Sequence, residues 1–225
     1  MVSITQALDI LIKRQLKVLR FLGASSGSFK IPDDVNLFYV TAVAGGGSGT
    51  TDEVFSLYSS GGGSGEYVYR KIIGAIPGET LTYTVGKGGR SNWRAHFEPG
   101  IPGGITSISR NGNEIFKVLG GQGGQVVDGF GPATLFIGGL PGYQNNNPRY
   151  SNNGGYGRPY AATNFGRGRG GSNPLGSSKL FPTDERSPSS YGFGYGGGGC
   201  STFGRFNFQG DGGNGALIIE YFTST

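Results

Sequence analysis

The sequence predicts an all-β domain preceded by an N-terminal amphipathic α-helix. Forty-seven of the 225 residues are glycine, where roughly 7% is usual. The glycines follow short stretches of β-branched and aromatic residues: Val35–Ala44 runs into Gly45–Gly47, and Leu81–Val85 runs into Gly86–Gly89. The chain also holds 15 Phe, 12 Tyr and one Trp, whereas disordered chains are poor in aromatic residues. We therefore expect strands separated by glycine tracts.

The N-terminal segment carries the signature of a helix. Ser3 followed by Gln6 forms a capping box, and apolar residues then recur at helical spacing. We expect the helix over residues 4–22, with Gly23 after its last turn. Its apolar stripe consists of Leu8, Leu11, Ile12, Leu16 and Leu19. One helix cannot bury so wide a stripe alone, so we expect it to pack on the β-domain, on copies of itself or on a partner protein. Residues 1–23 are accordingly predicted to serve attachment or oligomerisation.

The rest of the chain divides into a linker and a β-domain. Residues 24–28 are short and polar and are predicted to be the linker, and residues 29–225 form the β-domain. Within it, Glu66–Ile73 and Thr80–Val85 are expected to pair as a hairpin across a Pro-Gly turn at residues 75–78.

Further local patterns predict strands. Val35–Ala44 is expected to be a strand covered on both faces, and Ala216–Phe222 is dense enough in apolar residues to be a central buried strand. Asn111-Gly112 is the strongest hairpin signal in the chain. In residues 191–196 aromatic residues alternate with glycine, a period of two that predicts a strand with a bare glycine face.

Two long loops are predicted, at residues 90–104 and 138–190. The second is rich in Asn, Arg and Tyr and has few bulky aliphatic residues. Aromatic side chains beside Arg and Asn on loops supply contact area and adaptable hydrogen bonds, as in antibody paratopes. The candidate binding residues are Trp93, Arg94, His96, Phe97, Tyr143, Tyr150, Tyr156, Arg158, Tyr160 and Phe165. The alternative for each aromatic is burial against a glycine-rich sheet.

The sequence holds no catalytic or metal-binding motif. Cys200 is the only cysteine and His96 the only histidine, so we expect no disulfide framework, no Ser-His-Asp site and no metal or cofactor site. Gly86-Lys87 lacks the flanking residues of a phosphate-binding loop. The 14 acidic residues leave a glycosidase-like carboxylate pair as a minor alternative. We expect a protein that is not an enzyme.

The charge pattern leaves a second alternative open. The formal net charge is +5, without a block of five basic residues, which favours a solubilising surface charge over a nucleic-acid site. The basic residues of the central tract are interleaved with tyrosines, as in glycine-arginine segments that bind RNA. They are Arg149, Arg158, Arg167, Arg169 and Lys179. Asp9 and Lys13 interrupt any apolar run that would form a signal peptide, so synthesis in a cytoplasm without export is expected.

The order of these segments resembles the glycine-rich domain at the end of tailed-phage tail fibres and related receptor-binding virion proteins. Phe29–Pro32 precedes a strand that ends in Gly45–Gly47, as in the opening of that pattern. Gly65–Tyr67 and Pro77–Gly89 match its middle, and Gly210–Tyr221 matches its closing segment. The resemblance spans about residues 28–222, and the N-terminal helix is outside it.

The resemblance implies a jelly-roll-like β-sandwich in a virion, assembled in the host cytoplasm. It implies a homotrimer, contacts with other virion proteins through the N-terminal helix, and loops that bind a polysaccharide or an outer-membrane protein of the host surface. The candidate residues above would then be receptor-binding residues. A purely structural virion protein that decorates or cements the particle is the first alternative, and a glycine/arginine-rich RNA-binding protein is the second.

Overall fold

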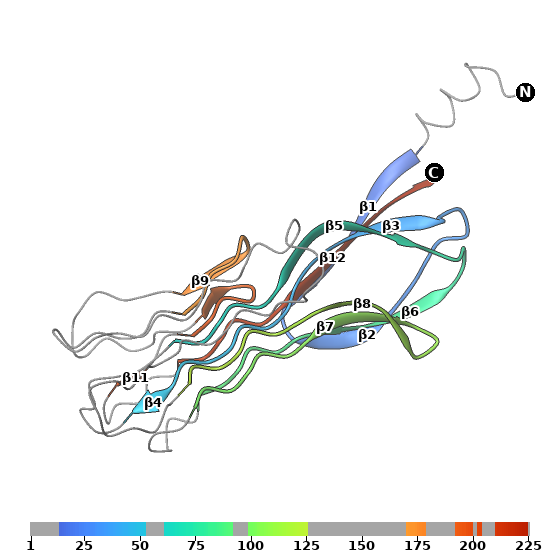
Figure 1. The fold of residues 1–225 in the computed structure, drawn as a ribbon. Coiled ribbons are helices and arrows are strands. Elements are labelled where there is room, and N and C mark those ends of the chain that lie inside the picture. Colours follow the sequence, from blue (N-terminus) through green and yellow to red (C-terminus); the bar gives the residue numbers. More distant parts are fainter. Residues whose placement is uncertain are drawn as a thin grey trace, which may run out of the picture.

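The computed structural model describes residues 14–52, 61–91, 99–125, 170–178, 192–199, 202–203 and 210–224. The described chain has two parts, which Figure 1 shows end to end. Two layers of strands lie at one end, and a bundle of extended glycine-rich segments continues from the strands toward the other end.

Two antiparallel sheets of four strands form the first part. Sheet I has the order β1 (Arg14–Leu22), β12 (Ala216–Ser224), β3 (Leu37–Val43) and β5 (Tyr67–Gly74). Sheet II has the order β2 (Ser25–Lys30), β6 (Thr80–Val85), β7 (Thr106–Arg110) and β8 (Asn113–Val118). Two short pairs lie outside the sheets. They are β4 (Thr51–Asp52) with β11 (Thr202–Phe203), and β9 (Gly176–Ser178) with β10 (Gly192–Gly194).

The two sheets share one hydrophobic core. Phe38 and Ile219 from sheet I are buried in the same cluster as Leu81, Ile108 and Phe116 from sheet II. Side chains alternate along each strand, so residues of one parity enter the core and the others face outward. Full burial of one such side chain contributes about 1.5–3 kcal/mol. The predicted all-β class is confirmed in this part.

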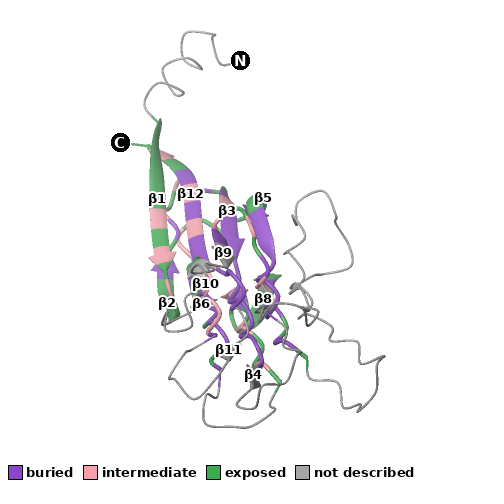
Figure 2. Ribbon diagram, turned by 90° about the vertical axis from the view of Figure 1, so that its left-hand side faces the viewer, coloured by how far each residue is buried: buried purple, intermediate pink, exposed green. Residues whose placement is uncertain are grey.

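Strand β12 occupies the interior position that its apolar sequence predicted. It lies between β1 and β3, and its residues Leu217, Ile219 and Tyr221 are buried in the core. Figure 2 shows β12 and β3 mostly buried, whereas β1 at the edge of the sheet is largely exposed. The predicted strand at Val35–Ala44 is confirmed by β3, which is buried over most of its length.

The predicted hairpin at Asn111-Gly112 is confirmed. These two residues join β7 to β8 and have φ angles of 50° and 81°. A two-residue turn of type I′ needs positive φ at both positions, and Asn and Gly tolerate it best. The local sequence therefore determines this pairing.

The predicted hairpin between residues 66–73 and 80–85 is wrong. β5 belongs to sheet I and β6 to sheet II, so the connection passes from one sheet to the other. Its turn is confirmed, since the amide of Glu79 donates to the carbonyl oxygen of Ile76 (3.0 Å) and Gly78 has a φ of 76°. A tight turn fixes the direction of the chain locally, but the core determined which strands pair.

Arg110 fastens this connection between the sheets. Its Nε donates to Glu79 Oε2 (2.6 Å), and one terminal nitrogen donates to Glu79 Oε1 (2.8 Å) and to the carbonyl oxygen of Gly74 (2.7 Å). The hydrogen bonds from Arg110 lower the pKa of the Glu79 carboxyl against the opposing effect of burial.

The predicted N-terminal helix is wrong for its second half. Residues 14–22 form β1, which pairs with β12 along its whole length, and the described residues contain no helix. Leu19 and Phe21 pack against the core, and the Phe21 ring stacks on Tyr83 with ring centroids 3.9 Å apart. An isolated helix gains little without packing, so pairing with β12 overrides the helical spacing. Residues 4–13 lie outside the described residues, with Leu8, Leu11 and Ile12 of the predicted stripe.

The predicted linker at residues 24–28 is also wrong, because most of it belongs to β2. Ser25–Lys30 pairs with β6 in antiparallel register, with Ser25 opposite Val85 and Lys30 opposite Thr80. The chain therefore passes from an edge strand of sheet I to an edge strand of sheet II through Gly23, which has a φ of 82°. No separate N-terminal arm begins or ends at this point.

Candidate binding surfaces

The glycine tracts form a hydrogen-bonded bundle with a period of three residues. In the segment 44–49, the amides of Gly45 and Ser48 donate to residues 104 and 101 of one neighbouring segment. The amides of Gly46 and Gly49 donate to residues 213 and 210 of a second segment, and those of Ala44 and Gly47 donate to residues 66 and 63 of a third. Donors three residues apart thus face the same neighbour, as in an extended helix with three residues per turn.

The carbonyl oxygens of the same segment accept from other neighbours. Those of Gly45 and Ser48 accept from Gly121 and Gly124, and that of Gly47 accepts from Gly199. Segment 44–49 is therefore enclosed on all sides by main chain. This corrects the expectation that glycine tracts merely separate strands: they are a second structural layer held by backbone hydrogen bonds.

Close packing explains why these segments are glycine. A Cβ atom on Gly47 would lie 2.5 Å from the carbonyl carbon of Gln122, where side chains do not fit. The predicted period of two does not continue through residues 191–196, because Gly194, the last residue of β10, and Gly196 have φ angles of 72° and 68°. The predicted bare glycine face is confirmed at Gly192, whose missing Cβ would meet the amide of Gly213.

A few side chains accept hydrogen bonds from backbone amides of the bundle. Asn214 Oδ1 accepts from the amide of Gly88 (2.9 Å), and Asp211 Oδ1 accepts from the amide of Ser91 (2.8 Å). The donors are again three residues apart. At the junction with the sheets, the buried hydroxyl of Thr106 donates to the carbonyl oxygen of Val43 (3.0 Å) and accepts from the amide of Gly86 (2.9 Å).

The segments of the bundle alternate in direction along the chain. Those that follow a strand run away from the sheets, and those that precede a strand run back toward them. Segment 44–49 runs outward from β3, and segments 62–66 and 210–215 run back into β5 and β12. Hydrogen bonds link the segments near the end away from the sheets, from Gly49 to Gly210 (2.9 Å) and from Gly100 to Gly124 (2.7 Å). We call this end the distal end; Figure 1 shows the described segments running toward it from the sheets.

The predicted binding residues lie in the chain intervals attached to the distal end. Residues 92–98 follow Ser91 and precede segment 99–104, and residues 126–169 follow segment 119–125. All ten candidates lie outside the described residues. They are Trp93, Arg94, His96, Phe97, Tyr143, Tyr150, Tyr156, Arg158, Tyr160 and Phe165.

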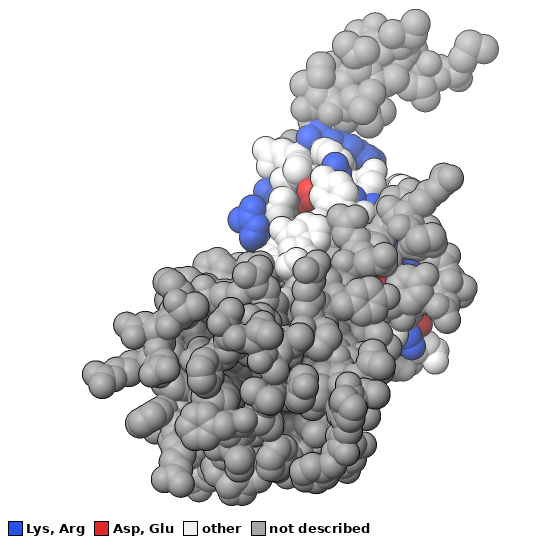
Figure 3. Space-filling view, turned by 60° about the vertical axis from the view of Figure 1, so that its left-hand side comes forward, with Lys and Arg blue, Asp and Glu red and all other residues white. Residues whose placement is uncertain are grey.

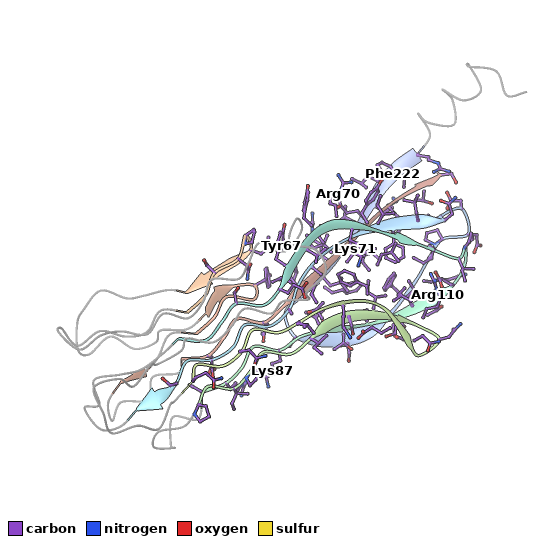
Figure 4. All side chains as sticks on the ribbon, in the orientation of Figure 1. Tyr67, Arg70, Lys71, Lys87, Arg110 and Phe222 are labelled. Atoms are coloured by element: carbon purple, nitrogen blue, oxygen red, sulfur yellow. The ribbon has the colours of Figure 1, made fainter. Side chains whose placement is uncertain are left out.

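Sheet I presents a second surface, its outer face, which the sequence did not predict. Apolar side chains stand exposed on it: Leu16, Val18 and Leu22 of β1, Leu37 of β3, Ile72 of β5 and Phe222 of β12. Figure 4 shows Arg70 and Phe222 on this outer side, whereas Lys71 lies between the layers. The ammonium group of Lys71 is 5.6 Å from the centroid of the Phe116 ring.

Arg70, on the edge strand β5, is held on the outer face in a strained conformation. Its φ is 46°, which non-glycine residues rarely adopt, at a bulge in the pairing of β5 with β3. Its amide donates to Thr41 Oγ1 (3.1 Å), its Nε is 3.2 Å from Glu220 Oε2, and its guanidinium lies 4.7 Å from the centroid of the Tyr39 ring. Contacts with β3 and β12 thus fix the backbone and side chain of this residue.

Two ionisable side chains elsewhere in the described chain, those of Asp34 and Tyr67, take part in structural contacts that shift their pKa values. Asp34 accepts from the hydroxyl and the amide of Ser224 and from the hydroxyl of Thr223, and these bonds lower its pKa from 3.8 to about 2. Burial, with a smaller contribution from Tyr69, raises the pKa of Tyr67, which packs with Val43 in a second hydrophobic cluster.

No metal-binding cluster of His, Cys, Asp or Glu occurs among the described residues. In the same part of the chain, no helix is long and apolar enough to cross a membrane. Every buried side-chain nitrogen or oxygen that the structure describes has a hydrogen-bond partner.

Comparison with known families gives one match. The model of a glycine-rich domain family matches residues 23–222, a range that runs from β2 into β12 and contains the whole glycine bundle. Among curated proteins, none matches this chain. Since the matched range covers most of the 225 residues, the chain belongs to the glycine-rich domain family.

Proposed function

We propose that this protein is a bacteriophage virion protein of the tail-fibre-tip or spike type, which binds the host cell surface through the chain intervals carried at the distal end. The observation that supports this is that glycine segments from several strands run to the same end of a bundle held by backbone hydrogen bonds. Binding residues are commonly carried on loops that a rigid scaffold positions. We also propose that the two four-stranded sheets form a jelly-roll-like β-sandwich.

The composition of these intervals supports a binding role. Trp93 and Arg94 lie in one interval, and Tyr150, Arg158 and Tyr160 lie in another. Trp, Tyr and Arg are the residues most often found at binding hot spots. The receptor in this proposal is a polysaccharide or an outer-membrane protein of the host.

Adsorption of variants to host cells tests the proposal. Alanine at Trp93, Arg94, Tyr150, Arg158 or Tyr160 should weaken adsorption and leave the melting temperature within a few degrees, because surface substitutions shift stability by about 0.5 kcal/mol or less. Ile101→Ala is a matched control: this exposed apolar residue lies within the described bundle and outside both intervals. Variants that unfold would place these residues in a core, and variants that stay folded and adsorb normally would refute the proposed surface.

The assembly that we propose is a homotrimer joined to other virion proteins through the N-terminal segment. Light scattering on the purified chain measures the oligomeric state directly. A stable monomer at micromolar concentration would contradict the homotrimer. In that case the symmetry of the assembly would be imposed by the particle.

A purely structural role, as a decoration or cementing protein, is the second candidate. The exposed apolar outer face of sheet I favours it, because apolar surface of this kind commonly marks contacts with other proteins. Binding of the isolated protein to host cells separates the two candidates: the receptor-binding protein binds, and the structural protein does not. Salt-dependent binding to RNA would instead favour the glycine/arginine-rich RNA-binding alternative.

A further inference from the structure

Among the described residues, β1 is an edge strand with a set of main-chain hydrogen-bonding groups that no neighbouring strand engages. It pairs only with β12 in sheet I, and all nine of its residues keep an unbroken register. The amide of Gly23 donates to Gly215, which continues this register. Hydrogen-bonded positions alternate in an antiparallel pair, so the odd-numbered residues of β1 bond to β12. The even-numbered residues, such as Leu16 and Val18, direct their N–H and C=O groups away from the sheet.

Two other edge strands carry features that hinder pairing with a further strand. β5 has an extra residue opposite β3, because Val40 pairs with Lys71 and Ala42 with Val68. β8 has an extra residue opposite β7 as well. Such bulges bend an edge and interrupt its ladder. β1 has neither a bulge nor a proline nor a glycine.

The outer side of β1 presents both cations and apolar side chains. In order, the even-numbered residues are Arg14, Leu16, Val18, Arg20 and Leu22. Leu16 is 47% exposed and Leu22 is 51% exposed. Lys17 adds a third cation, β1 holds no acidic residue, and the one carboxylate on the adjacent part of β12, Glu220, is engaged by Arg70. Figure 3 shows the Lys and Arg atoms of this end around a mostly uncharged surface.

We infer that the edge of β1 binds an extended acidic-apolar segment of another protein, which adds to sheet I as a further strand. Main-chain hydrogen bonds would provide affinity, and side chains at alternate positions would provide selection. Carboxylates opposite Arg14 and Arg20 and β-branched residues opposite Leu16 and Val18 complement this edge. A second copy of β1 fits poorly, since it would double the cations without adding a carboxylate. This site lies in the sheet part of the molecule, and the inference does not depend on what the distal end binds.

A designed peptide tests the inference with the full-length protein. The sequence Val-Thr-Glu-Thr-Val-Glu-Val-Thr-Glu, antiparallel to β1, places glutamates opposite Arg20, Lys17 and Arg14. Fluorescence anisotropy of the labelled peptide should show saturable binding. A control peptide with glutamine in place of each glutamate should bind about tenfold more weakly, since three exposed ion pairs together contribute on the order of 1.4 kcal/mol. Equal binding of both peptides, or no binding at millimolar concentration, would overturn the inference.

A matched pair of variants tests strand addition itself. Val18→Pro removes an N–H that points away from β12, whereas Val18→Ala keeps this N–H and removes methyl groups only. Val18→Pro should abolish peptide binding, and Val18→Ala should weaken it by about tenfold or less. Unchanged binding by a folded Val18→Pro variant would exclude the edge as the site.

Amide hydrogen exchange provides a measurement that does not depend on the folding of any variant. In the wild-type protein, saturating peptide should slow exchange at the amides of Leu16, Val18 and Arg20, which face the open edge. The amides of Lys17 and Leu19, already bonded to β12, should change little by comparison. Binding without this alternating protection would show that the peptide attaches by charge alone and would refute strand addition.

Discussion

The amide of Gly46 donates to the carbonyl oxygen of Gly213 at 2.9 Å, and the carbonyl oxygen of Gly46 accepts from the amide of Gly89 at 2.8 Å. Gly46 follows β3, Gly213 precedes β12 and Gly89 follows β6. Backbone hydrogen bonds alone thus join these three segments. The same relationship repeats three residues later, between Gly49 and Gly210. Interactions between peptide groups, and few side chains, define the interior of this part of the molecule.

Gly47→Ala should destabilise the protein strongly. The added Cβ would lie 2.5 Å from the carbonyl carbon of Gln122, and backbone on that side cannot move away without breaking neighbouring hydrogen bonds. Overpacking costs about 1–3 kcal/mol, and we expect the upper end of that range in urea unfolding. Gly74→Ala is the matched control, because nothing lies within 4 Å of the added atom. Equal stability of the two variants would contradict the close packing of the bundle.

Thr106→Val should be destabilising although it preserves shape. The hydroxyl joins the carbonyl oxygen of Val43 to the amide of Gly86, and both groups would lose a partner in a buried position. An unsatisfied buried group costs about 1–3 kcal/mol. Thr106→Ser keeps the hydroxyl and should retain most of the stability. Thermal unfolding of both variants measures the difference, and a Val variant as stable as the Ser variant would show that the bridge is dispensable.

Two truncations should behave differently. Removal of residues 1–13 leaves β1 intact, so the melting temperature of the described fold should stay within about 2 °C of the wild type. Removal of residues 1–23 deletes β1, exposes one side of β12 and removes Leu19 and Phe21 from the core. The loss of two such side chains, roughly 3 kcal/mol, corresponds to about 6 °C or more for a domain of this size. Similar melting curves would mean that β1 contributes little to sheet I.

Acidification should release the end of β12 from Asp34. The folded-state pKa of about 2 lies below the ordinary value of 3.8 because Ser224 and Thr223 donate to the carboxylate. A lowered pKa means that the contact stabilises the fold fully above pH 3.8 and is lost as the pH falls through about 2. Exchange of the Ser224 amide should therefore be slow at pH 5 and speed up, relative to its intrinsic rate, below pH 3. In Asp34→Asn, the pH-dependent step should disappear; its persistence would assign the step to another group.

The sequence predicted those elements whose structure is determined by residues near one another. Asn111-Gly112 fixed a hairpin through positive φ angles, and the apolar run at Ala216–Phe222 predicted an interior strand. The sequence did not predict how β5 and β6 are placed in different sheets, because the same turn suits a hairpin and a crossing between layers. The helical spacing of Leu16 and Leu19 was misleading, since residues 14–22 also suit a strand once β12 is beside them.

The glycine bundle was missed for a different reason. A period of three in hydrogen bonding leaves no period in side chains when nearly every residue is glycine, as in residues 44–49. The outer face of sheet I was missed because Arg70 and Glu220 lie far apart in the sequence, on β5 and β12. Only the strand order brings them together.

The glycine bundle also gives the molecule two regions of different thermodynamic character. Exposure of apolar surface raises the heat capacity on unfolding, and exposure of peptide groups lowers it. The sheets bury Phe38, Leu81 and their neighbours, whereas the bundle buries peptide groups and hardly any carbon side chains. The bundle therefore adds chain length with little gain in heat capacity, so its share of the folding free energy curves less with temperature than that of the sheets. Cooling, which weakens hydrophobic cores, leaves the end of the molecule that carries the long intervals comparatively unaffected.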